Sequence, residues 1–139
     1  MTDEPLVAKK LAFIETCVHE LRTLGRVDAI DHDVREERFI EHTLQLAIQA
    51  ALDVASHIVS DERLGEPATN KELFALLERG KWLDPGQVPT LRDMAGFRNV
   101  LVHGYSEVDR EVVKDVLRHR LDDLLGFVAA VRARLGPRS

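Results

Sequence analysis

Residues 98–105 read Arg98-Asn99-Val100-Leu101-Val102-His103-Gly104-Tyr105, and they end the helix around which we expect the chain to be organised. Gly104 is a natural helix stop, because glycine adopts the left-handed conformation at little cost. Arg98 can hold a phosphate through a two-pronged hydrogen bond, and His103 can move a proton near neutral pH. Tyr105 adds a hydroxyl that can donate, accept or be covalently modified. The stretch therefore predicts a helix end equipped for phosphate chemistry.

Apolar residues recur at spacings of three and four along the rest of the chain, as on the buried face of a helix. The first helix, for example, buries Val7, Leu11, Ile14, Val18 and Leu21, and Cys17 widens the same stripe. There is no strand-like alternation and no internal repeat. The pattern predicts an all-α, up-down bundle of about five helices in a single domain, residues 1–139. We expect these helices at about 6–24 and 34–60, between Thr69 and Gly80, at 91–103, and from the 106–109 segment to Leu135.

Three hydroxyl residues stand at expected helix starts, each followed three positions later by an acidic residue: Thr69 with Glu72, Thr90 with Asp93, and Ser106 with Asp109. This is the pattern of a capping box, in which the hydroxyl accepts from a backbone N–H and the acidic side chain reaches back. The pairs predict where the last three helices begin.

The second helix is apolar over a wide arc, so we expect it to be buried on several sides. Asp53 and His57 stand out on it, because residues four apart face the same way and can hydrogen-bond. One interpretation is a surface pair on the single polar edge of this helix. The other is a pair that faces the site and orients a base or the Arg98 guanidinium.

Composition narrows the class of protein. Of 139 residues, 45% are hydrophobic and 31% charged, as in a globular domain. With Cys17 as the single cysteine, neither an intramolecular disulfide nor a cysteine metal cluster can form. No apolar run is long enough for a membrane span, and the first residues lack the build of a signal peptide. We expect a cytoplasmic protein with no metal and no cofactor.

The net charge of −5 opposes a broad phosphate-binding surface, since sequence-independent nucleic-acid affinity comes mostly from Lys and Arg. Any RNA contact must therefore be a local basic patch. Arg118, His119 and Arg120 form the most basic cluster. It is either an ordinary solvated face or a contact for the RNA backbone, with Arg118 and Arg120 as the candidate side chains.

The helix itself does not aim Arg98 and His103 at one point. At about 100° per residue, Asn99 and His103 share a face, whereas Arg98 projects about 140° away from His103. A two-fold dimer that buries the fourth helix against its mate would bring both kinds of residue into one cleft. We therefore expect a homodimer that forms around this helix.

The spacing Arg98, four residues, His103, one residue, Tyr105 resembles the motif of the HEPN superfamily, and in particular of the HepT-like toxins. Helix order and the polar residue after the arginine, Asn99, also fit. The resemblance implies a HEPN-like bundle acting as a homodimeric endoribonuclease, the toxin of a toxin–antitoxin system. It further implies a composite catalytic site of Arg98 and His103. A nucleotidyltransferase antitoxin would neutralise the toxin by attaching AMP to Tyr105.

RNA already carries its nucleophile, the 2′-hydroxyl beside each phosphate. Cleavage needs a base, an acid and stabilisation of charge on the phosphorus centre. Two His103 side chains could move the protons, two Arg98 side chains could hold the phosphate, and Asn99 could orient the phosphate or the imidazole.

Two alternatives stay open. One is a non-catalytic HEPN-like module that binds a nucleotide or docks a nucleotidyltransferase, which the acidic net charge favours. The other is a helical interaction protein in which Arg98 and His103 are interface residues. Tyr105 could likewise simply close the end of the bundle.

Overall fold

The computed structural model describes residues 3–103 and 108–136. Within these ranges every regular element is helical, as predicted. The α-helices form five successive helical segments, because α5, the π-helical segment η4 and α6 follow one another without a break. Their bounds are α1 Glu4–Leu24, α2 Val34–Asp61, α3 Asn70–Arg79, α4 Val88–His103, α5 Arg110–Asp115, η4 Val116–Arg120 and α6 Leu121–Leu135. Single 3-10 turns occupy Val27–Ala29 and Pro85–Gln87.

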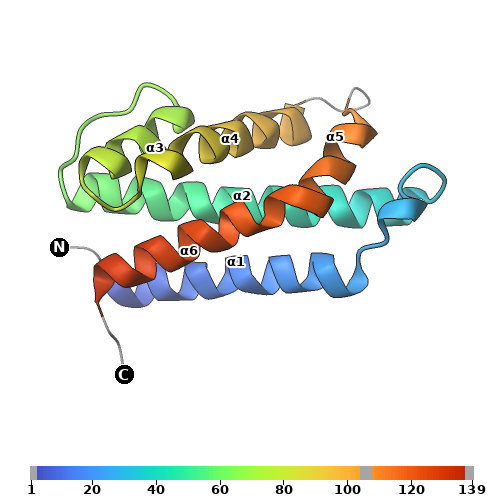
Figure 1. Cartoon of the computed structure of the whole chain (residues 1–139), viewed down its shortest axis with the longest axis horizontal. Helices are drawn as coiled ribbons and strands as arrows, with labels where there is room; N and C mark the ends of the chain where they lie inside the picture. Colours follow the sequence, from blue (N-terminus) through green and yellow to red (C-terminus); the bar gives the residue numbers. More distant parts are fainter. Residues whose placement is uncertain (1–2, 104–107, 137–139) are drawn as a thin grey trace.

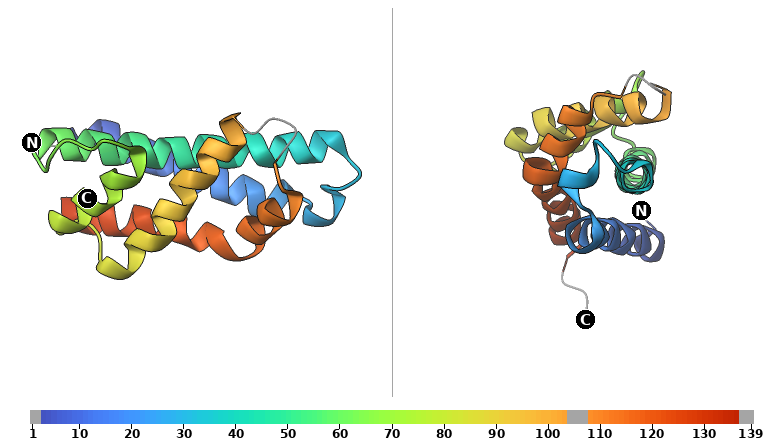
Figure 2. Two further views of the ribbon diagram at one scale, coloured as in Figure 1. Left: turned by 90° about the horizontal axis from the view of Figure 1, so that it is seen from above. Right: turned by 90° about the vertical axis from the view of Figure 1, so that its right-hand side faces the viewer.

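The long helix α2 is the element on which the others pack (Figure 1). α1 runs antiparallel beside it, and α6 lies against α1 while it crosses α2. α3 and α4 cover the opposite side of α2, and α4 crosses it at an angle (Figure 2). The C-terminal end of α4 therefore lies over the N-terminal part of α2, next to the start of α5.

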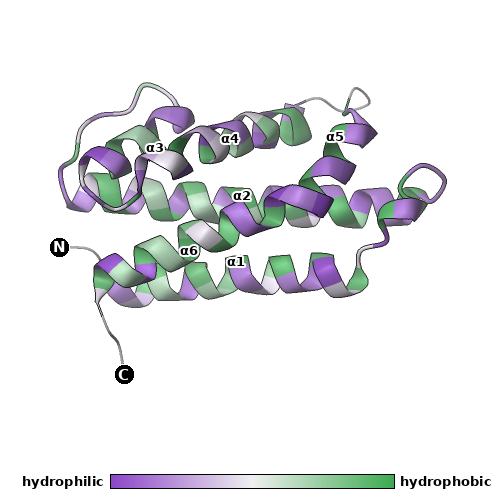
Figure 3. Cartoon of the chain, viewed as in Figure 1, coloured by the Kyte–Doolittle hydropathy of each residue, from purple (hydrophilic) through white to green (hydrophobic). Residues whose placement is uncertain are grey.

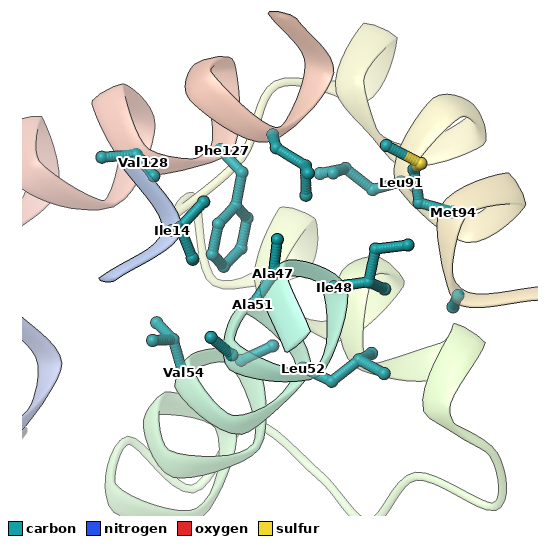
Figure 4. Packing of buried hydrophobic residues seen from close by; sticks show 14 of the residues in the cluster. Ile14, Ala47, Ile48, Ala51, Leu52, Val54, Leu91, Met94, Phe127 and Val128 are labelled. Atoms are coloured by element: carbon teal, nitrogen blue, oxygen red, sulfur yellow. The ribbon is translucent and has the colours of Figure 1, made fainter. Parts of the chain in front are cut away.

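Alternating apolar and polar stripes explain this packing, because each helix turns its apolar stripe toward its neighbours (Figure 3). Small residues in the middle of α2, Ala47 and Ala51, let the surrounding helices approach closely (Figure 4). Phe127 of α6 meets Phe74 of α3 edge to face, with ring centroids 5.9 Å apart. The prediction that α2 is buried on several sides is confirmed.

Cys17 belongs to the core, as predicted. Its side chain is 2% exposed on the buried face of α1. Burial raises the pKa of the thiol to about 11, and the negative charge of Glu20 acts in the same direction. A thiol in this environment stays protonated at neutral pH and is inert.

The predicted start of α4 is wrong by three residues. The helix begins at Val88, because the 3-10 turn Pro85–Gln87 runs directly into it and Asp84 with Gln87 forms the capping box. Thr90 lies inside the helix and donates its hydroxyl to the carbonyl of Gln87 at 3.0 Å. Because the 3-10 turn leads directly into the helix, α4 starts upstream of Thr90, the residue that the capping pattern had favoured.

Two other helix starts also differ from prediction. Thr69 stands at the N-cap of α3 as expected, but its side chain makes no capping hydrogen bond, and the Glu72 carboxylate accepts from the backbone of Ala68. α5 is capped by Asp109, whose carboxylate accepts from the backbone N–H of Glu111 at 2.9 Å. The predicted partner Ser106 lies outside the described residues.

Candidate active site

The C-terminal turn of α4 carries the candidate catalytic groups. His103 is the last residue of the helix, and its side chain is exposed. Arg98 is half-buried, and its guanidinium donates from Nη1 to Asn99 Oδ1 at 3.2 Å. Arg98 Nε is buried without a hydrogen-bond partner among the described residues. An unpaired buried donor costs free energy, so Arg98 Nε is a polar group whose hydrogen bond the described residues leave unmade.

Asn99 makes a contact that the sequence did not indicate, because its side-chain oxygen accepts a hydrogen bond from the guanidinium of Arg98. Its role in orienting the phosphate or the imidazole stays a prediction. This contact fixes one edge of Arg98 and leaves other N–H groups of the fork available. Five donors on one planar group suit a tetrahedral anion such as a phosphate.

The burial of the two candidate residues agrees with their directions on an ideal helix. Arg98 lies on the side of α4 that faces the core, together with Leu91 and Met94, and His103 lies on the exposed side. The groups are separated by about 140° around the helix axis. Within one copy of the chain, the His103 imidazole thus faces solvent and the Arg98 guanidinium lies at the edge of the core, so the two groups do not face each other.

Gly104 and Tyr105 lie outside the described residues, so the structure does not place the predicted modification site. The flanks of this segment are placed. Leu101 lies just before it in α4, and Val108 and Asp109 follow it. Both flanks border hollows in the surface of α2.

Two adjoining hollows run along the N-terminal part of α2 and share Arg38 and Glu41 in their walls. The first has a volume of about 490 Å³ and reaches Leu101. The second has a volume of about 700 Å³ and reaches the start of α5 at Val108–Glu111. The surface beside the end of α4 is therefore concave.

Glu41 is a polar residue of this surface that the sequence analysis missed. Burial raises the pKa of its carboxyl, and the neighbouring Glu37 carboxylate adds to the effect. Glu41 Oε2 is buried without a hydrogen-bond partner in the described part of the chain. Glu37 instead accepts from Arg110 at 2.8 Å. The spacing of Glu37 and Glu41, four residues on one helix, was the available signal.

The sequence model of the family described as "Ribonuclease HepT-like" matches residues 14–131, most of the chain. The chain belongs to this family. An mRNA nuclease HepT of Shewanella oneidensis is 27% identical to it over 129 residues, which are 92% of this chain and 97% of that protein. A tRNA nuclease HepT of Aphanizomenon flos-aquae is 30% identical over 135 residues, which are 95% of this chain and 92% of that protein.

Solved structures of HepT-like proteins share the fold. The tri-AMPylated HEPN toxin of Shewanella oneidensis in complex with an MNT antitoxin superposes with a TM-score of 0.85 at 28% identity. The superposition covers 96% of this chain and 99% of that one. The predicted HEPN-like bundle and the resemblance to HepT-like toxins are thereby confirmed.

Asp53 and His57 of this HepT-like chain pair with residues of α1 and α2 rather than with Arg98 or His103, and their supporting role stays a prediction. Asp53 accepts from Gln49 at 2.8 Å and lies 3.5 Å from the ammonium of Lys10. His57 pairs with Asp61 at 3.0 Å. Because α1 runs along this part of α2, the polar edge carrying both residues faces α1. The interpretation as surface groups on a polar edge is the one the structure supports.

Arg118 and Arg120, the candidate RNA contacts, lie in the π-helical segment between α5 and α6. Arg118 is 3.5 Å from Asp28, and Arg120 is 3.8 Å from both Asp115 and Asp123. These carboxylates neutralise much of the cluster, which favours the solvated, ion-paired face over a phosphate contact.

The described residues contain no group of three or more His, Cys, Asp or Glu side chains arranged to hold a metal ion. Nor does that part of the chain contain a helix both long and apolar enough to cross a membrane.

Proposed function

We propose that this chain is the toxin of a toxin–antitoxin pair and an endoribonuclease, with Arg98 and His103 as its catalytic residues. The proposal rests on the hydrogen bonding and burial of Arg98 in a chain that belongs to a ribonuclease family. Its guanidinium is steered by Asn99, its buried Nε has no partner among the described residues, and His103 ends the same helix. The nuclease relatives act on mRNA and tRNA, which makes RNA in the cytoplasm the proposed substrate.

The chemistry is an internal transfer of the phosphoryl group. One His103 takes the proton of the 2′-hydroxyl, whose oxygen attacks the adjacent phosphorus, and a second His103 protonates the departing 5′-oxygen. The P–O5′ bond breaks, and a 2′,3′-cyclic phosphate remains on one product. Arg98 binds the non-bridging oxygens, where negative charge develops in the transition state. Each step uses groups of the protein and the RNA, so the mechanism needs no metal.

A homodimer supplies the geometry that one chain lacks. Arg98 faces the core margin and His103 faces solvent, so a two-fold pairing of α4 ends places the Arg98 of one copy beside the His103 of its mate. The proposed catalytic unit is thus shared between two single-domain chains, each of residues 1–139.

Regulation is proposed to act on Tyr105, two residues beyond His103. The similar HEPN toxin of known structure is tri-AMPylated and bound to an MNT antitoxin. Adenylate groups attached to Tyr105 by a nucleotidyltransferase antitoxin would place several negative charges beside Arg98. They would compete for its donors and repel the phosphates of RNA.

The test is RNA cleavage by the purified full-length protein in EDTA. We expect Arg98→Ala and His103→Ala each to abolish cleavage while the helical circular dichroism stays unchanged. His119→Ala is the matched control, because His119 is an exposed histidine paired with Asp115 at 3.0 Å and distant in sequence from α4. Cleavage that persists in His103→Ala overturns the catalytic assignment.

Adding an excess of the inactive His103→Ala protein to the parent tests the shared site. A mixed dimer holds a single His103, and cleavage uses one His103 as base and the other as acid, so the activity per parent chain should fall. If each chain owned a complete site, the parent's activity would not change. If the parent protein cleaves no RNA yet binds a nucleotidyltransferase, the alternative of a non-catalytic docking module holds. The acidic net charge favours this alternative.

The modification of Tyr105 is tested by measuring the intact mass of the protein after incubation with the antitoxin and ATP. A Tyr105→Phe protein that still gains the mass of AMP excludes Tyr105 as the acceptor.

A further inference from the structure

Several exposed cations have no acidic partner among the described residues, and two of them, Lys71 and Arg92, lie against or on α4. Basic residues around α5 and α6 are mostly ion-paired, for example Arg110 with Glu37 and Arg132 with Glu15. Lys71 of α3 and Arg92 of α4 are exposed, and neither has a carboxylate within ion-pair distance among the described residues. Their positive charge is thus available to an anionic ligand.

Gly96 shows where the charge of Lys71 lies. A Cβ atom added at Gly96 would be 3.2 Å from Lys71 Cε and 3.3 Å from Lys71 Nζ. The end of the lysine side chain therefore rests on the backbone of α4, in the space that a side chain at position 96 would fill. The fold thus places an ammonium from α3 on the surface of the helix that carries Arg98 and His103.

Helix geometry places other polar side chains of α4 on the same face as Gly96, where the Lys71 ammonium lies. With about 100° and about 1.5 Å per residue, His103 lies roughly 20° around the axis from Gly96 and roughly 10 Å along it. Arg92 lies roughly 40° from Gly96 and roughly 6 Å in the opposite direction, and Asn99 falls between Gly96 and His103. Arg92, Asn99 and His103 are all exposed. A guanidinium, an ammonium, an amide and an imidazole thus follow one face of α4.

The one acidic residue of α4, Asp93, lies on one flank of this line. Asp93 is about 100° around the helix from Arg92, on the flank away from Asn99. Glu72, next to Lys71 in sequence, is engaged by the backbone N–H of Ala68 at 3.2 Å. A local basic track therefore exists on a protein whose net charge is −5.

We propose that the face of α4 carrying Arg92, Asn99 and His103 lines the cleft between the two copies and binds the backbone of single-stranded RNA, with Lys71 and Arg92 holding successive phosphates on one side of the scissile one. We call this surface the α4 track, defined by Arg92, Lys71, Asn99 and His103. The inference rests on the proposed ribonuclease function and adds its substrate-binding residues. Lysine and arginine side chains along a strand are how proteins bind single-stranded nucleic acid without reading its sequence.

The experiment measures binding of a short fluorescein-labelled single-stranded RNA to the full-length His103→Ala protein, which holds substrate without cutting it. Lys71→Ala and Arg92→Ala are each expected to reduce the slope of log affinity against log salt by about 0.7, the value for one phosphate on a single strand. Between about 50 and about 200 mM salt, affinity then falls roughly 2.5-fold less than in the parent. Lys71→Arg should retain the parent slope.

Lys81→Ala is the matched control, because Lys81 is an exposed lysine that follows α3 rather than lying on α4. In the active background, Lys71→Ala and Arg92→Ala should raise KM and leave kcat nearly unchanged, since they hold RNA away from the reacting phosphate. A purely structural role would instead lower the melting temperature and leave the salt slope alone.

The outcomes separate the two proposals. If the parent cleaves RNA but both variants keep its salt slope, the α4 track is wrong and the ribonuclease stands. If the parent cleaves nothing while the His103→Ala protein binds RNA with slopes that fall in the variants, the track stands and the catalytic proposal fails. Loss of slope in Lys81→Ala as well would show diffuse attraction and overturn the track.

Discussion

Replacing Gly96 by alanine should make the protein more stable and at the same time weaken its hold on RNA. Alanine in a helix interior is favoured over glycine by about 0.5–1 kcal/mol, because the unfolded glycine chain has more conformations to lose. The new Cβ would meet Lys71 Cε at 3.2 Å and Nζ at 3.3 Å. These atoms end a flexible, exposed side chain, so the lysine can swing away from α4 at small cost.

The net expectation for Gly96→Ala is a gain of about 0.5 kcal/mol or more in the free energy of unfolding, seen as a rise of roughly 2–4 °C in Tm. The same change pushes the Lys71 ammonium off α4. Affinity for single-stranded RNA should fall, by less than in Lys71→Ala, and with a smaller salt slope than in the parent. Urea unfolding followed by circular dichroism and the RNA titration measure the two effects on one sample.

Gly126→Ala is the matched control. Gly126 also lies inside a helix, α6, and its added Cβ would meet only Gln87 Nε2, at an ordinary 3.5 Å. It should gain stability with unchanged RNA binding. In the double variant of Lys71→Ala and Gly96→Ala, the second substitution should weaken binding no further, because both act through one ammonium. A Gly96→Ala protein that loses more than about 1 kcal/mol refutes the placement of a yielding Lys71 side chain against Gly96. One that keeps the parent's RNA affinity and salt slope refutes the part of Lys71 in RNA binding.

Three further outcomes follow from the packing and the pKa shifts. Phe127→Ala should lose about 3–5 kcal/mol in urea unfolding, because the ring is fully buried against Phe74, and a loss below about 1 kcal/mol would contradict that packing. Cys17, with a pKa near 11, should resist iodoacetamide at neutral pH and react only after unfolding; rapid native labelling would show an exposed thiol. Arg132 lowers the pKa of Glu15, so its contribution is present above the ordinary glutamate pKa and lost as pH falls through the lowered value. Arg132→Ala should thus cost at most about 1 kcal/mol near neutral pH, since both side chains are nearly half exposed, and nothing in strong acid; a cost that grows toward acid would reverse the assignment.

Short-range patterns carried most of the fold and the family. Helical spacing of apolar residues located the rods of the bundle, because each helix must bury one face whatever its neighbours are. The spacing of Arg98, His103 and Tyr105 carried the likeness to HepT-like proteins, since four residues along a helix fix relative position without tertiary information. Helix starts were less secure. The 3-10 turn Pro85–Gln87 leads directly into α4, so the helix begins at Val88 rather than after Thr90. A capping pattern in the sequence does not show that a turn and a helix are continuous.

The sequence by itself determined the helices, the buried stripes and the motif at the end of α4, because these depend on residues within a few turns of one another. Only the tertiary structure decided which charges remain free. Asp53 faces Lys10, Arg118 faces Asp28, and Lys71 rests on Gly96, and each contact joins segments far apart in the chain. Charge acts through distance in space, so the sequence could point only to its most basic run as a candidate RNA contact, whereas the packing of α3 on α4 adds Lys71 as a proposed one.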